Sequence, residues 1–260
     1  MKYSVFIILF FVCQLTIGQT MKAIKDAVGK AYMSDDKTAN QTKDKAIEEA
    51  KKDALKKAGI AEYIGSSNVL LTIENNKKIS QVFNSIASVE LTGAITNIQN
   101  IRTQKKHDES AQQDYYEALI DSEVIKYEKK SDPAFVFDIK GIRESYKANE
   151  ALTFETIAYA NGFLRIFLLS DSQCLQLFPN QYEKTNSIKE SEHIHFPVNK
   201  GIAYSLDLKK ENELDNLIFV FTKNNIPFTG KENMNDILYW IYSISPDERR
   251  VKNFSFVVSE

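Results

Sequence analysis

A stripe of alanines is the feature that most constrains how this chain can fold. In the stretch 39–58, ANQTKDKAIEEAKKDALKKA, alanine recurs every four residues, at Ala46, Ala50, Ala54 and Ala58. Residues four apart lie on one face of an α-helix, so this spacing predicts a helix with a narrow face of small apolar side chains. Gly59 is expected to end the helix, because glycine readily takes the left-handed conformation of a helix C-terminus. A helix lined with alanine can approach its neighbour closely, which favours packing against a sheet.

Two later stretches are predicted to form that sheet. Val89–Ile101 spaces apolar residues among threonine and asparagine, and Tyr115–Tyr127 alternates apolar with polar residues. Both patterns predict strands, and the polar residues His107–Asp114 between them predict a connecting loop. The first predicted domain, residues 21–128, is thus a small α+β unit, which also includes a strand at Ala27–Met33 and a shorter amphipathic helix at Lys78–Ala87.

A charged segment at 127–133, closed by Pro133, marks the predicted boundary to a second domain, residues 133–260. Seven short strands with turn signals between them predict an antiparallel β-sandwich with its core at 133–226. Asn161-Gly162 is the strongest hairpin signal. A helix at Met234–Ile244 and a strand at Val251–Val258 are expected within 231–258. The seven predicted strands are Phe135–Ile139, Leu152–Ala158, Phe163–Leu169, Cys174–Phe178, His193–Phe196, Ala203–Leu208 and Leu217–Thr222.

The predicted fold class is therefore α+β. A small domain with one helix on an antiparallel sheet comes first, and an antiparallel β-sandwich with a C-terminal helix follows it.

Residues 1–18 have the pattern of a secretory signal peptide. A short positive start precedes an unbroken apolar run at 5–12, and the small residues Thr16 and Gly18 predict cleavage between Gly18 and Gln19. A membrane anchor is the alternative, but the apolar stretch is shorter than the roughly 20 residues of a spanning helix. A lipoprotein signal would use Cys13, yet Val12 stands where lipid attachment needs a small residue. We expect export to the periplasm, to an outer-membrane-associated position or out of the cell, and no transmembrane span in the mature chain.

The charge balance disfavours nucleic acid as a partner. The chain carries 33 Lys and Arg against 35 Asp and Glu, a net charge of −2. It has no surplus of positive charge with which to neutralise phosphates. Its two cysteines, of which signal cleavage would leave Cys174, exclude a disulfide framework and a cysteine-based zinc site.

Few residues suggest chemistry. His193 and His195 lie on one side of a predicted strand and could form half of a metal site, but His107 belongs to the other predicted domain, so edge or surface histidines are the simpler interpretation. Cys174 starts an apolar strand and reads as a small buried hydrophobe, although a strand histidine could in principle pair with it as a nucleophile. Asp35-Asp36 are expected to cap or turn the chain before the first helix. We expect no catalytic residue, no cofactor and no metal.

The segment Leu177-Phe178-Pro179-Asn180 predicts a fixed corner of the sandwich. Pro179 restricts the backbone, and the Asn180 side chain can bond its own backbone in a turn. The polar loop 181–192 that follows is long enough to serve as a contact surface on a rigid scaffold. The candidate contact residues are Phe178, Pro179, Asn180 and Tyr182.

Two stretches resemble known families. The sequence AYMSDDKTANQTKDKAIEEAKKDALKKAGI, with the two strands behind it, is similar over residues 27–127 to the N-terminal domain of the flagellar assembly protein FlgT and to small bacterial envelope lipoproteins. Residues 133–226 resemble a bacterial family of domains of unknown function that shares the Leu-Phe-Pro-Asn motif and an aliphatic-Pro pair, here Phe196-Pro197. That family occurs in exported proteins, and the resemblance implies a binding or accessory module.

The sequence therefore predicts an exported, non-catalytic protein of the bacterial cell envelope. It would act as an accessory or assembly module through contacts with an envelope protein or with copies of itself. One alternative is a glycan or peptidoglycan binder, if Tyr159, Phe163 or Tyr182 form an exposed aromatic platform. Another is an exported hydrolase whose site no motif reveals.

Cleavage after Gly18 can be tested directly. Intact-mass analysis of the protein recovered from the periplasm or the medium should give a chain that begins at Gln19. A recovered chain that keeps Cys13 and carries lipid on it would contradict this prediction.

Overall fold

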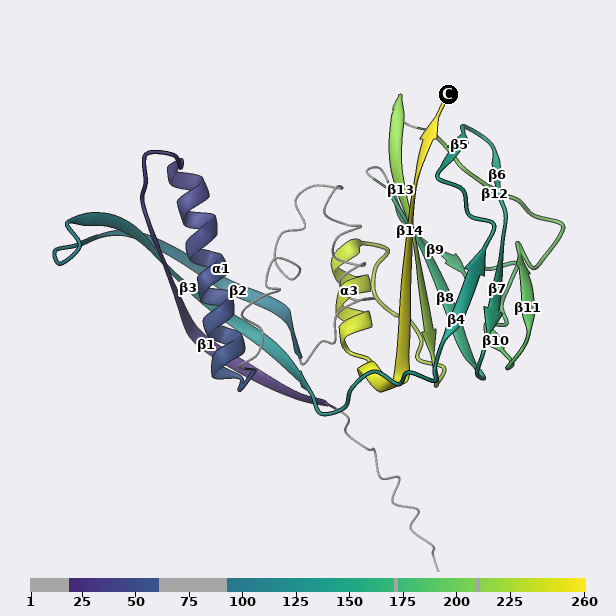
Figure 1. The fold of residues 1–260 in the computed structure, drawn as a ribbon, viewed down its shortest axis with the longest axis horizontal. Helices are drawn as coiled ribbons and strands as arrows, with labels where there is room; N and C mark the ends of the chain where they lie inside the picture. The colour runs from purple at the N-terminus through teal and green to yellow at the C-terminus, as the bar shows by residue number, and fades with distance from the viewer. Residues whose placement is uncertain (1–18, 61–92, 171–172, 209–210) are drawn as a thin grey trace, which may run out of the picture.

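The computed structural model describes residues 19–60, 93–170, 173–208 and 211–260 (Figure 1). These residues form a mixed α/β structure that is mostly antiparallel sheet, with two α-helices among them. The helix predicted at Lys78–Ala87, the start of the strand predicted at Val89–Ile101 and Gly18 lie outside the described residues.

The first part of the chain is a three-stranded antiparallel sheet with a helix on one face. Strands β1 (Gln19–Tyr32), β3 (Gln113–Tyr127) and β2 (Gly93–Asp108) lie in the order β1-β3-β2, and α1 (Ala39–Lys57) covers the β1 side. The strand predicted at Ala27–Met33 in fact begins at Gln19. The connecting loop is shorter than the predicted His107–Asp114. Strand β2 continues to Asp108 and β3 begins at Gln113, so only residues 109–112 form the turn.

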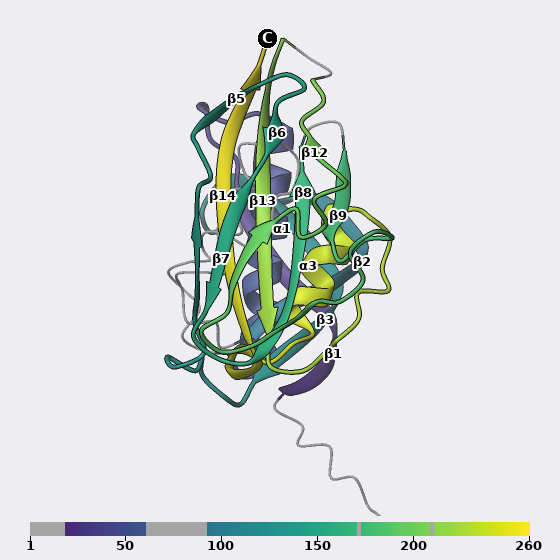
Figure 2. The ribbon, with the colours of Figure 1, turned by 90° about the vertical axis from the view of Figure 1, so that its right-hand side faces the viewer.

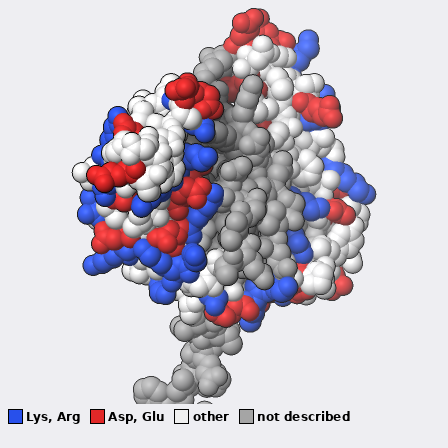
Figure 3. All heavy atoms as spheres, turned by 60° about the vertical axis from the view of Figure 1, so that its left-hand side comes forward, with Lys and Arg blue, Asp and Glu red and all other residues white. Residues whose placement is uncertain are grey.

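Ion pairs across the two strands hold the end of this hairpin. Lys105 Nζ lies 2.7 Å from Asp114 Oδ2, and His107 Nδ1 lies 2.7 Å from Asp114 Oδ1. A ladder of backbone bonds needs no apolar side chains where the strands face water, so the polar composition that predicted a loop is compatible with strands. Basic and acidic side chains lie side by side on the visible face of this part (Figure 3).

Local signals define both ends of α1. Thr38 is the N-cap: its Oγ1 accepts from the Gln41 backbone N–H at 3.3 Å, and the Gln41 side chain accepts from the Thr38 N–H at 2.8 Å. This reciprocal pair is a capping box. Asp35-Asp36 lie in the turn before it. At the other end Gly59 has a φ of 86°, and the Ile60 N–H donates to Leu55 O at 3.0 Å, as the sequence predicts for a glycine-ended helix.

The alanine stripe lies against β1 at backbone distance. Ala46, Ala50 and Ala54 are fully buried. Gly29 of β1 faces them so closely that a Cβ added there would lie 2.0 Å from Ala46 O and 2.1 Å from Ala50 N. The helix therefore touches the strand through its main chain, which explains why small residues are needed on both sides of the contact.

The second part contains two larger sheets and a short pair of strands (Figure 2). The sheet nearer the first part has the order β10-β8-β13-β14-β5, with β9 also on β8 and only β5 parallel to its neighbour. The other sheet has the order β11-β7-β4. The strands are β4 (Phe137–Lys140), β5 (Ser145–Lys147), β6 (Ala151–Leu152), β7 (Phe154–Ala158), β8 (Gly162–Leu169), β9 (Cys174–Phe178), β10 (Ser187–Ile188), β11 (His193–Phe196), β12 (Tyr204–Ser205), β13 (Asn212–Thr222) and β14 (Arg249–Ser259), and β6 pairs with β12.

Aromatic side chains fill the space between these two sheets. Phe219 of β13 meets Phe154 of β7 edge to face at 5.3 Å, and Phe221 meets Phe137 of β4 at 5.4 Å. These rings belong to one buried cluster that draws on both sheets. Edge-to-face and tilted arrangements suit the charge distribution of aromatic rings.

The hairpin predicted at Asn161-Gly162 is wrong. Strands β7 and β8 flank this dipeptide but lie in different sheets and do not pair. Neither residue has the positive φ that a type I′ hairpin turn requires. Gly162 instead serves close packing, since a Cβ there would lie 2.6 Å from the Phe221 ring. The chain crosses from one sheet to the other at this point.

Helix α3 (Met234–Tyr242) lies where the two parts meet (Figure 1). It shares one buried cluster with Ile125 and Tyr127 of β3 and with Ile218 and Val220 of β13. The Tyr127 hydroxyl donates to the carbonyl of Tyr242 at 2.7 Å. The Arg249 guanidinium lies over the Tyr127 ring, at 5.4 Å from its centroid. The two parts are thus joined by a common core as well as by the chain.

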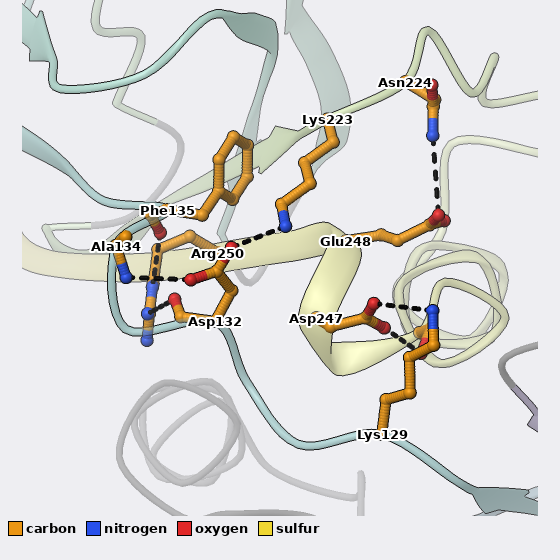
Figure 4. Close-up of polar contacts among 10 residues, drawn as sticks. Lys129, Asp132, Ala134, Phe135, Lys223, Asn224, Asp247, Glu248 and Arg250 are labelled. Carbon is orange, nitrogen blue, oxygen red and sulfur yellow. Dashed lines mark hydrogen bonds and ion pairs between the residues drawn. The ribbon is translucent and has the colours of Figure 1, made fainter.

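The segment between the parts is bound to the start of β14, to the turn before β14 and to Lys223 directly after β13 (Figure 4). Lys129 Nζ lies 3.2 Å from Asp247 Oδ2, and Lys223 Nζ lies 2.6 Å from Asp132 Oδ2. The Arg250 guanidinium donates to the carbonyls of Asp132, at 2.7 Å, and Phe135, at 3.1 Å. The segment 127–133, predicted as the domain boundary, is therefore held in place by several side-chain contacts. The domain limits 21–128 and 133–260 stay a prediction.

Replacing Gly29 with alanine should strain the contact between α1 and β1. The new methyl group would meet helix backbone, which cannot move aside as a side chain can, so the free energy of unfolding should fall by about 3 kcal/mol. Denaturant unfolding, monitored by circular dichroism, measures this change. The control is Lys30→Ala, at the next residue of β1, whose side chain is exposed. An unfolding midpoint of Gly29→Ala equal to that of the control would show that the helix lies further from the strand.

Candidate functional site

The corner predicted at residues 177–180 is held by the Asn180 side chain. Its Oδ1 accepts from the backbone N–H groups of Tyr182, at 2.8 Å, and Glu183, at 3.0 Å. Its Nδ2 donates to Leu177 O at 2.8 Å. The turn predicted at Asn180 is therefore present. Phe178 is buried and meets the Phe196 ring edge to face at 5.0 Å, so it anchors the corner from inside.

Glu183 connects this corner to a second loop, 197–201. The Glu183 side chain is buried, with 5% of the residue exposed. Its Oε1 accepts from the backbone N–H of Val198 and from that of Asn199, the latter at 3.0 Å. Its Oε2 accepts from Asn180 Nδ2 at 2.8 Å and from the Tyr204 hydroxyl. Four donors thus compensate for burying the carboxylate, as a buried charge requires.

The Tyr204 hydroxyl is a permanent donor in this network. Burial, reinforced by its hydrogen bond to Glu183, raises the pKa of Tyr204 well above its usual range. The phenol therefore keeps its proton at physiological pH and stays a hydrogen-bond donor.

Two apolar side chains project from the loops that Glu183 joins. Tyr182 is 62% exposed and Val198 is 49% exposed. The backbone of Tyr182 is bonded to Asn180, and the backbone of Val198 is bonded to Glu183. Both side chains are therefore exposed to solvent, while hydrogen bonds hold the backbone that carries them. We name Tyr182 and Val198, with the loops 179–186 and 197–201 that carry them, the contact loops.

The two strand histidines share one carboxylate that sequence reasoning missed. Glu155 Oε1 lies 2.9 Å from His193 Nδ1 and 3.7 Å from His195 Nε2. The hydrogen bond from His193 is the largest of the effects that lower the pKa of Glu155. Glu155 reaches this position because β11 pairs antiparallel with β7, which sets His195 opposite it. Nothing local in the sequence indicates that pairing.

The remaining candidates are scattered. His107 lies in the first part, 2.7 Å from Asp114. Cys174 packs against the core cluster at α3. Burial, with a smaller effect from the charge of Glu232, raises the pKa of the Cys174 thiol to about 12, so the thiol is protonated at neutral pH. Over residues 19–60, 93–170, 173–208 and 211–260, no three His, Cys, Asp or Glu side chains are grouped as metal ligands would be.

Gln19, the expected first residue after cleavage, starts β1 and pairs with Tyr127. Its side-chain amide donates to Ser243 O at 2.6 Å, so this strand end is bound to the segment that follows α3. No helix in the described part of the chain is long and apolar enough to cross a membrane.

The chain matches no protein-family model. It matches no curated protein either. A solved structure titled "AvmM Catalyzes Macrocyclization in Alchivemycin A Biosynthesis" is similar over 50% of this chain and 92% of that chain, with 11% sequence identity and a TM-score of 0.24. A similarity this weak carries no argument about fold or function.

Replacing Glu183 with alanine should loosen both contact loops. Four donors would lose their acceptor, and the free energy of unfolding should fall by about 3 kcal/mol. Chemical denaturation measures the loss, and Glu190→Ala, an exposed glutamate on the same stretch, should change stability by less than about 0.5 kcal/mol. Equal unfolding midpoints for the two variants would show that the Glu183 network does not hold the loops.

Proposed function

We propose that this protein is an exported, non-catalytic protein of the bacterial cell envelope, an accessory or assembly module that acts through protein contacts. The observation that carries this proposal is the buried Glu183, which fixes the backbone beneath the exposed Tyr182 and Val198. A surface whose backbone is already ordered loses little further entropy when a partner binds. An exposed tyrosine on such a surface is a typical binding hot spot.

The architecture of the second part supports the same function. Its two aromatic-lined sheets face each other, and we infer that they form the predicted β-sandwich, residues 133–260. Loops at the end of a sandwich are held by a rigid frame and commonly carry binding surfaces. The partner is a protein of the cell envelope or a second copy of this chain.

Residues 1–18 support export, because they combine a positive start, an apolar run and a small-residue cleavage site. The resemblances of residues 27–127 to the FlgT N-terminal domain and of residues 133–226 to a domain family that occurs in exported proteins support the envelope location. We therefore place the mature chain in the periplasm, in association with the outer membrane, or outside the cell.

A glycan-binding function is the second candidate. Tyr159 and Tyr182 are 48% and 62% exposed, and stacking of sugars on tyrosine rings needs exposed ring faces. Phe163 is half-buried, however, and no ring contact joins these three side chains into a platform. Protein contact is the better-supported proposal, and co-sedimentation with purified peptidoglycan distinguishes the two.

The double replacement Tyr182→Ser with Val198→Ser should remove the partner. In a crosslinking pull-down from envelope fractions, we expect recovery of the partner to fall roughly tenfold or more, because a central aromatic anchor is lost. The matched control is Tyr239→Ser with Val257→Ser, an exposed tyrosine and valine at 42% and 39% on other elements. Its recovery should equal that of wild type.

Two outcomes would contradict the proposal. Unchanged recovery with the Tyr182 and Val198 variant would exclude the contact loops. Loss of recovery when Cys174, His193 and His195 are replaced together, in a protein that still folds, would favour a site built on those side chains.

A further inference from the structure

Strand β1 is an edge strand, and its free edge is only partly covered. Among the described strands, the sheet order β1-β3-β2 leaves one side of β1 without a neighbour. The backbone N–H and C=O groups on such an edge can pair with an added strand.

Hydrogen bonds show which residues of β1 face outward. The Val28 N–H donates to Asp53 Oδ2 of α1 at 2.9 Å, so it points away from β3. The Met33 N–H donates to Asp114 O at 2.9 Å, so it points toward β3. Backbone direction alternates along a strand, and Lys30 and Tyr32 therefore turn their N–H and C=O groups outward, as Val28 does.

The C-terminal half of α1 covers the first half of this edge and leaves the second half open. Lys57 Nζ donates to Asp26 O at 2.9 Å, and Asp53 accepts from Val28. The helix then crosses β1 at Gly29. Beyond that crossing, no described residue bonds the outward backbone groups of Lys30 and Tyr32.

A groove of about 550 Å³ lies along the open half. Residues 28–34 of the β1 edge and its extension form one wall, and Lys45 and Glu49 of α1, with Lys37 before the helix, line the other side. Glu49 is paired with Lys52 at 2.7 Å. Lys37 and Lys45 have no ion-pair partner within the described ranges. The groove thus combines an open strand edge with a surplus of positive charge, because Lys30, Lys37 and Lys45 line it with a single carboxylate, Glu49. Asp36 beside the groove offsets part of the charge of Lys37 and Lys45.

We infer that this groove binds an extended acidic peptide segment of another protein, which adds to β1 as a fourth strand. Backbone bonds to Lys30 and Tyr32 would hold the segment, and Lys37 and Lys45 would attract its carboxylates. A second copy of β1 is a poorer occupant, because its matching segment, residues 28–34, carries Lys30 and no carboxylate to meet Lys37 and Lys45. This site is in the first part and is independent of the contact loops.

The first test uses a synthetic peptide of four Glu-Thr repeats with blocked ends, titrated into the protein by calorimetry and followed by amide hydrogen exchange. Binding should slow exchange at the Lys30 and Tyr32 amides, which face water in the free protein. A peptide of four Lys-Thr repeats should not bind. Absence of binding by the acidic peptide, or binding that leaves both amides unprotected, would overturn the inference.

Two pairs of variants then separate backbone pairing from charge. Lys30→Pro removes an outward N–H that the fold does not use, and it should weaken peptide binding roughly tenfold relative to Lys30→Thr. Lys37→Glu with Lys45→Glu should weaken it by a similar factor, whereas Lys25→Glu with Lys56→Glu, of equal charge change outside the groove, should not. Equal affinities of Lys30→Pro and Lys30→Thr would overturn strand addition to β1. Equal affinities of the two charge-reversed variants would overturn the binding of an acidic segment in this groove.

Discussion

Strand β13 belongs to two hydrophobic cores, one on each of its faces. The positions of α3, of the β11-β7-β4 sheet and of the first part depend on it. Its residues Leu217, Phe219 and Phe221 point into the aromatic cluster shared with the β11-β7-β4 sheet. Ile218 and Val220 point to the opposite face, into the cluster that includes α3 and the inner ends of β2 and β3. A strand buried on both faces needs an unbroken apolar run, which LIFVF supplies. Helix α3 is therefore required on one face and the second sheet on the other, and α3 in turn gives the first part its place.

The sequence predicted most reliably the features that depend only on residues close together in the chain. The alanine stripe, Gly59 and the turn at Asn180 are local, so the end of α1 and the corner at 177–180 agree with expectation. Strand pairing depends on distant residues, and this is why Asn161-Gly162 was misjudged and Glu155 was missed. Glu183 was missed for a different reason: a glutamate in a polar loop resembles a solvated side chain, and only the loop 197–201 and Tyr204, brought there by the fold, bury it.

The two proposed binding surfaces are carried by one connected body. Residues 129–135 are bound to β14 and its preceding turn by ion pairs and by the Arg250 bonds to two carbonyls, and Tyr127 is bonded to Tyr242. The groove beside β1 and the contact loops therefore lie on parts that are joined by a shared core and by these bonds. Two sites on one rigid body can bind two segments of a single partner more tightly than either alone only if that partner matches their spacing. Such a protein would recognise the spacing of two segments in its partner as well as their sequences.

The far end of β2 shows how a long strand can stand in water without causing aggregation. Residues 99–105 are all exposed, and within the described part of the chain no strand other than β3 pairs with β2. The ladder with β3 is interrupted by irregularities between Ile95 and Asn97 and between Gln99 and Arg102, and Asn100 has a φ of 51°. Such breaks bend the strand and disfavour its pairing with the edge of another sheet. These irregularities therefore act against edge-to-edge association of this hairpin with other sheets.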